Sequence, residues 1–202
     1  MICVEGSDYY LRYLRKNVGA LQNVRIVDAF VSTGSDTGLE YVHSAGTGRL
    51  KTVTETSSDS GMTFISAANI LDQAPAKELV VWKSDTDGFD VSILLTAFEE
   101  IVARCEIIWF ELQLFNNSNS EMDQLSAFLT KLGTTSRQVV IFDNFGRLML
   151  SIDAAQSLQI ISQLQRWIKL QDDSGHLAVN YFDVWILPTA RAEALVTSVL
   201  GT

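Results

Sequence analysis

The stretch VVWKSDTDGFD, residues Val80–Asp90, joins a short apolar run to three aspartates and a glycine. An apolar run of this kind indicates a buried strand, and aspartate and glycine are typical of the turn that follows one. Residues 90–105 then have the 3.6-residue apolar period of a helix. The stretch therefore predicts a strand, a turn and a helix, with the carboxylates at the carboxyl end of the strand.

The same alternation continues along the chain. Strand-like runs lie at 2–5, 24–31, 78–83, 106–113, 138–144 and 181–187, and helical stretches at 7–18, 90–105, 120–133 and 154–170. Because the strand-like runs are apolar throughout, we expect strands that helices cover on both faces. The pattern predicts an α/β fold with a doubly wound, mostly parallel sheet. Residues 1–202 are expected to form a single domain, in which 32–63 are a long loop with a weak strand at 50–55.

Composition excludes several classes of partner. The 202 residues carry a formal net charge of −9, which disfavours binding to nucleic acid or to an anionic membrane. The longest apolar runs are shorter than the roughly 20 residues that span a bilayer. Cys3 and Cys105 lie in apolar stretches and are interpreted as free buried thiols, which favours a reducing cytoplasm. His43 and His176 are isolated, so no metal site is predicted.

Glu5 ends the first strand-like run and is followed by Gly6. In nucleotide-binding α/β folds, an acidic residue at such a strand end accepts hydrogen bonds from both hydroxyls of a ribose. The alternative is a carboxylate placed near the N-terminus of the next helix, where the helix dipole stabilises it. Both interpretations remain open from spacing alone.

Asp85 and Asp87 follow a strand end, where ligands bind in open α/β sheets. Close carboxylates could bind a cation, orient a substrate hydroxyl or act as a general base. The alternative is an ordinary turn, in which Gly88 supplies backbone freedom. In either case we expect Asp90 to cap the following helix. Glu111 ends another strand and could share the rim of the same site. A carboxylate hydrolase that uses Asp85 and Glu111 is a more distant alternative.

Several motifs occur in an ordered series. They are ICVEG (2–6), YYLRYLRKN (9–17), NVRIVDAFVS (23–32), KSDTDGFD (83–90), IIWFELQLF (107–115), VVIFDNFGRLMLS (139–151) and NYFDVWILP (180–188). Together they resemble the FkbM-like family of S-adenosylmethionine-dependent methyltransferases, whose sheet is seven-stranded and Rossmann-like. The most specific part is the pattern K-x-D-x-[DE]-G-[FA]-[DE], and the resemblance extends from about residue 2 to residue 188.

The resemblance implies a role for each matching residue. Glu5 would bind the ribose of S-adenosylmethionine, and Asp28, Ala29 and Phe30 would lie near its adenine. Lys83, Asp85, Asp87 and Gly88 would form the rim that faces the methyl acceptor, a hydroxyl on a carbohydrate or a secondary metabolite. By hypothesis, Asp85 or Asp87 orients or deprotonates that hydroxyl while its oxygen attacks the methyl group.

The chain departs from the family pattern at its start. The family's first strand and glycine-rich cofactor loop would precede residue 1, so the resemblance implies weak or no binding of S-adenosylmethionine by these 202 residues. It also implies an open sheet edge, through which two copies could pair. An alternative function follows from the same departure: a non-catalytic remnant or interaction domain that keeps the fold without cofactor binding.

Overall fold

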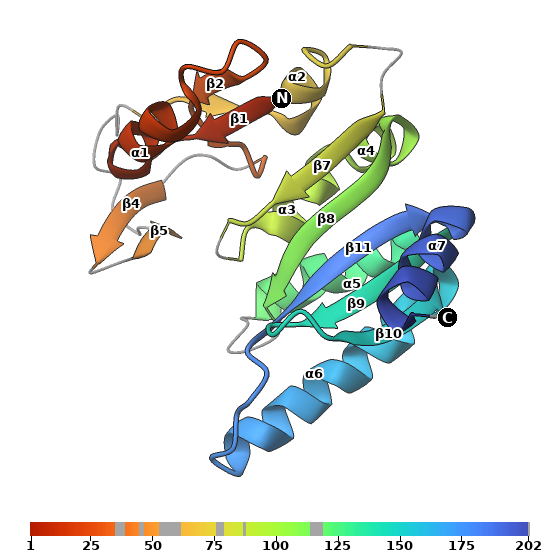
Figure 1. Ribbon diagram of the computed structural model, residues 1–202. Helices are drawn as coiled ribbons and strands as arrows, with labels where there is room; N and C mark the ends of the chain where they lie inside the picture. Colours follow the sequence, from red (N-terminus) through yellow and green to blue (C-terminus); the bar gives the residue numbers. More distant parts are fainter. Residues whose placement is uncertain are drawn as a thin grey trace. The chain divides into compact units, whose positions relative to one another are not determined.

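A computed structural model describes residues 1–34, 39–44, 47–52, 62–75, 79–86, 88–113 and 119–201. The chain divides into two compact units, Met1–Glu78 and Leu79–Thr202, and each is described by itself (Figure 1). Within the described ranges, no helix is both long enough and apolar enough to cross a bilayer.

The Met1–Glu78 unit contains short parallel strand pairs. β1 (Ile2–Glu5) pairs with β2 (Arg25–Asp28), and α1 (Asp8–Val18) connects them. β3 (Phe30–Val31) pairs with β6 (Phe64–Ile65), which leads into α2 (Ala67–Leu71). β4 (Leu39–Ser44) and β5 (Thr47–Thr52) form an antiparallel hairpin. This hairpin lies in the segment predicted as a loop with one weak strand at 50–55, so that prediction missed a strand.

The Leu79–Thr202 unit contains a five-stranded sheet. Its strands are β7 (Val80–Ser84), β8 (Cys105–Gln113), β9 (Arg137–Asp143), β10 (Leu148–Asp153) and β11 (Tyr181–Pro188), in the order β10-β9-β11-β8-β7. β7 and β8 are parallel, whereas the other three pairings are antiparallel. The prediction of a doubly wound, mostly parallel Rossmann-like sheet is therefore wrong. The last strand, β11, lies between β8 and β9 and runs opposite to both.

Burial along the strands gives the physical reason for this correction. On β8, Phe110 and Leu112 are buried, while Trp109, Glu111 and Gln113 are half-buried. β11 alternates in the same way. A sheet with one buried face and one partly exposed face is typical of antiparallel pairing, whereas parallel strands are usually buried on both faces.

Helices cover the two faces of this sheet unequally. They are α3 (Asp90–Thr96), α4 (Phe98–Arg104), α5 (Asn119–Leu132), α6 (Ser157–Asp173) and α7 (Thr189–Leu200), with a 3-10 turn at Ala154–Gln156. Figure 1 shows α3, α4 and α5 on one side of the sheet and α7 on the other. α7 packs through Ala192 on Val140, Phe142 and Leu187. Residues 90–105 were predicted as one helix, but the backbone breaks at Ala97, where φ is −133° and ψ is 35°.

The sequence Asp143-Asn144-Phe145-Gly146 is typical of a turn, and the structure has one there. It joins β9 to β10, and Gly146 has a φ of +74°. Oδ1 of Asp143 accepts hydrogen bonds from the N–H groups of Phe145 and Arg147, both at 2.9 Å. A side-chain acceptor of this kind stabilises a tight turn, which accounts for the buried aspartate.

Candidate functional site

In the Met1–Glu78 unit, Glu5 lies beside Asp28, Ala29 and Phe30, for which the family resemblance implies a place near the adenine. β1 and β2 are parallel neighbours with Glu5 opposite Asp28, so both acids lie at the same carboxyl edge. The backbone is joined there as well, since the N–H of Ala29 donates to the carbonyl of Glu5 at 3.2 Å. Glu5, Asp28, Ala29 and Phe30 therefore converge at one end of one strand pair.

The two acids at this edge have different surroundings. Glu5 is half-buried, and its Oε1 accepts the N–H of Ser7 at 2.7 Å. Burial raises the pKa of Glu5, and the backbone N–H groups of Ser7 and Gly6 oppose that effect. Asp28 instead forms an exposed ion pair with Arg15 at 3.0 Å. Glu5 is thus the acid held in fixed geometry, and Asp28 already has a cationic partner.

Phe30 gives the edge an aromatic side. Its ring lies 5.9 Å from that of Phe64, measured between centroids. A Cβ at Gly6 would overlap the Phe30 ring, so the ring lies directly against the backbone that follows Glu5. Ala29 is buried. A glycine beside Glu5 is therefore required by the packing of Phe30.

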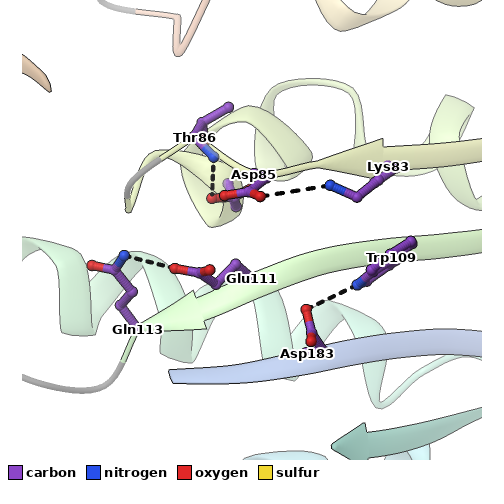
Figure 2. A network of polar contacts seen from close by, with 8 residues as sticks. Lys83, Asp85, Thr86, Trp109, Glu111, Gln113 and Asp183 are labelled. Atoms are coloured by element: carbon purple, nitrogen blue, oxygen red, sulfur yellow. Dashed lines mark hydrogen bonds and ion pairs between the residues drawn. The ribbon is translucent and has the colours of Figure 1, made fainter. Parts of the chain in front are cut away.

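In the Leu79–Thr202 unit, Lys83 and Asp85 lie at the end of β7. Nζ of Lys83 is 3.6 Å from Oδ2 of Asp85, and it also lies 4.7 Å from the ring centroid of Trp109 (Figure 2). Trp109 stacks on Trp185 of β11, with centroids 4.7 Å apart. The Lys83 ammonium therefore has two partners, a carboxylate and an aromatic face, both partly exposed.

Glu111 lies on the same sheet face as Trp109, directly opposite Asp183 of β11. Nε2 of Gln113 donates to Glu111 at 2.7 Å, and Nε1 of Trp109 donates to Asp183 at 3.1 Å (Figure 2). Burial raises the pKa of Tyr181, and the charges of Glu111, Asp183 and Asp85 raise it further. Asp85, Glu111 and Asp183 thus form an acidic group at one end of this face.

The sequence did not identify Trp109, Gln113, Tyr181 or Asp183 as parts of this group. A signal was present in the alternation Trp109-x-Glu111-x-Gln113 and Tyr181-x-Asp183-x-Trp185, with apolar residues between. Alternation with period two places one set of side chains on one sheet face. The two triplets therefore mark the partly exposed face of β8 and β11.

The turn after β7 differs from its predicted form. Phe89, not Asp90, is the N-cap of α3, and its side chain forms no capping bond. Asp90 is buried in the first turn, where its Oδ2 accepts the N–H of Thr86 at 3.1 Å. The predicted helix cap is wrong, because the carboxylate points back into the preceding turn. Gly88 has a φ of +103°, which requires the backbone freedom of glycine. Asp87 lies outside the described residues.

In the part of the chain that the structure describes, no group of three or more His, Cys, Asp or Glu side chains is arranged to bind a metal ion. Cys3 and Cys105 are free cysteines, the first half-buried and the second buried. Comparison of the chain with protein-family models, with curated proteins and with solved structures gave no match.

Proposed function

We propose that the chain is an S-adenosylmethionine-dependent methyltransferase that acts on a hydroxyl oxygen of a carbohydrate or secondary metabolite. One observation carries the proposal: Glu5 and the segment Asp28–Phe30 end two adjacent parallel strands. Ligands of open α/β sheets bind at the carboxyl ends of parallel strands, and an acid there is suited to a ribose. The two free cysteines favour the reducing cytoplasm as its location.

The chemistry of Glu5 suits a ribose diol. A carboxylate has about four lone-pair sites, and Oε1 uses one of them for the N–H of Ser7. The Ser7 bond fixes the carboxylate, so the two ribose hydroxyls could donate to it without further ordering of the side chain. The Phe30 ring supplies an apolar surface of the kind on which an adenine packs.

Asp85 is the proposed acceptor-side residue, with Asp87 as its alternative. The cofactor would supply a methyl group bonded to a positively charged sulfur, and this methyl group would pass to the acceptor oxygen while the electron pair of the broken sulfur–methyl bond stays on the sulfur. The hydroxyl proton passes to the carboxylate and then to solvent. Nζ of Lys83 lies 3.6 Å from Oδ2 of Asp85, so this ion pair helps to orient the carboxylate.

Binding of S-adenosylhomocysteine to the isotope-labelled chain, followed by NMR, tests the proposal. We expect weak but saturable binding, with shifts at the amides of Gly6, Ser7, Ala29 and Phe30, which follow the ends of β1 and β2. Glu5→Gln should weaken binding by about tenfold, because a charge-assisted hydrogen bond contributes about 1.5–3 kcal/mol.

Asp8→Asn is the matched control, because Asp8 is an exposed acid at the start of α1 and its change should leave binding unaltered. Shifts that avoid the ends of β1 and β2, or equal binding by Glu5→Gln, would contradict the cofactor role. The non-catalytic interpretation would then be favoured.

A further inference from the structure

The helix α6 has two exposed apolar side chains next to each other. Ile161 and Ile168 of this helix are buried, whereas Trp167 and Leu170 are 40% and 59% exposed. Each residue turns the helix by about 100°, so Leu170 lies roughly opposite Ile168, with Trp167 as its neighbour one turn earlier. In Figure 1, α6 lies at the border of the Leu79–Thr202 unit. Tryptophan is enriched among the residues that contribute most to binding at protein interfaces, so this exposed pair indicates a contact surface.

Two opposite charges lie on the same side of α6. Arg166 comes four residues before Leu170 and Asp173 three residues after it, so both are neighbours of Leu170 on the helix surface. Both are exposed, and neither forms an ion pair with any residue in the described ranges. They are about 10 Å apart along the helix axis, because each of the seven residues rises by roughly 1.5 Å. This side of α6 therefore has the order positive charge, apolar pair, negative charge.

We propose that this side of α6 binds a second copy of the chain, with the two α6 helices packed antiparallel. A two-fold axis that passes beside Leu170 would place Arg166 of each copy opposite Asp173 of the other, because the midpoint between these two positions is next to Leu170. Trp167 and Leu170 of both copies would then be enclosed between two ion pairs. The order of charges is reversed in an antiparallel copy, so the surface is complementary to itself.

A second copy fits this surface better than a partner with charges of one sign. An acidic partner would pair with Arg166 but be repelled by Asp173, and a basic partner would do the reverse. Parallel packing of two copies would place each charge opposite a like charge. One helix pair is a small interface, and two copies of formal net charge −9 repel each other, so we expect a weak, concentration-dependent dimer.

This inference goes beyond the proposed methyl transfer and does not depend on it. α6 lies in the Leu79–Thr202 unit, whereas the proposed ribose contact lies in the Met1–Glu78 unit. Oligomeric state and nucleoside binding are measured separately, so the failure of one proposal leaves the other intact. The α6 surface also differs from the open sheet edge through which the family resemblance implies pairing. A dimer formed through that edge would not respond to changes on α6.

Analytical ultracentrifugation over a range of protein concentrations tests the proposal, at physiological ionic strength, which screens the repulsion between copies. We expect a monomer–dimer equilibrium for the unaltered chain. Arg166→Glu and Asp173→Arg should each weaken dimerisation by about tenfold or more, because each change places like charges opposite each other. The two changes together should restore the affinity to within about threefold, because the exchanged charges are again complementary.

Asp172→Arg is the matched control for Asp173→Arg. Asp172 is exposed but lies roughly opposite Leu170 on the helix, so its change should leave dimerisation unaltered. Leu170→Glu should abolish the dimer and keep the fold, because the leucine side chain is already exposed.

Three results would overturn the proposal. The first is a chain that stays monomeric up to about 1 mM, which would leave this surface to a different partner or to none. The second is a dimer that Arg166→Glu and Leu170→Glu do not weaken, which would show that another surface forms it. The third is a double variant that dimerises no better than the single ones, which would contradict the antiparallel pairing of Arg166 with Asp173.

Discussion

Replacing Phe110 with alanine is expected to lower the free energy of unfolding by about 4 kcal/mol, the usual range for a buried phenylalanine being about 3–5. Phe110 is fully buried, with 0% of its surface exposed, on the helix-covered face of β8. Its ring meets Phe128 of α5 edge-on at 5.7 Å between centroids, and Phe128 meets Phe98 of α4 at 5.8 Å. The change removes the ring that packs the sheet against Phe128 of α5.

Chemical denaturation measures this loss. Phe110→Leu retains most of the apolar volume and should cost less than half as much. Phe145→Ala is the matched control, because Phe145 is 62% exposed in the β9–β10 turn and its removal should change stability by less than about 0.5 kcal/mol. A loss below about 1 kcal/mol for Phe110→Ala would show that the helix-covered face is not the core of this unit.

Replacing Arg137 with alanine should destabilise the chain by about 3 kcal/mol, because hydrogen bonds to charged groups contribute about 1.5–3 kcal/mol each and their effects are not additive. The half-buried guanidinium donates to the carbonyls of Val102 and Cys105, both at 2.7 Å, and to that of Glu106 at 3.1 Å. These carbonyls lie at the end of α4 and the start of β8, where the helix leaves acceptors without partners. Alanine would leave all three without their donor.

Arg191→Ala is the matched control for this arginine. Arg191 binds the Glu106 side chain at 2.6 Å but is 60% exposed, so its loss should cost less than about 1 kcal/mol. Arg137→Ala removes hydrogen bonds to backbone carbonyls, including that of Glu106, whereas Arg191→Ala removes an exposed ion pair with the Glu106 side chain. Equal, small losses in both would contradict the role of Arg137 at the end of α4.

Local patterns predicted the elements better than their arrangement. The apolar runs at Ile2–Glu5 and Val80–Ser84 form the expected strands, and the turn at Asp143–Gly146 forms as its residues indicate. The position of β11 depends on pairing with two distant strands, which no local run encodes. The alternation of polar and apolar residues in 109–113 and 181–185 did indicate a partly exposed face, but the high apolar content of these runs obscured it.

The sequence likewise indicated some residues of the candidate site and not others. The position of Glu5 at the end of a strand left two interpretations open, and the family resemblance implied the ribose contact. The parallel pairing with β2 brings Asp28 beside it. The environment of Asp90 could not be predicted, because an aspartate at this position can either cap the following helix or bury its carboxylate in the preceding turn. What distinguishes them is the direction of the side chain, and it points to the N–H of Thr86.

The central claim is that the Glu5 carboxylate binds the ribose of an adenosine-containing cofactor. The most direct test compares the binding of adenosine and 2′,3′-dideoxyadenosine by the unaltered chain and by Glu5→Gln. We expect the unaltered chain to bind adenosine about tenfold or more tightly than the dideoxy analogue, because only adenosine has hydroxyls that can donate to the Glu5 carboxylate. Glu5→Gln should lose most of this preference, because a neutral amide accepts these hydrogen bonds more weakly than a carboxylate does. Equal binding of the two nucleosides by the unaltered chain, or an unchanged preference in Glu5→Gln, would contradict the claim.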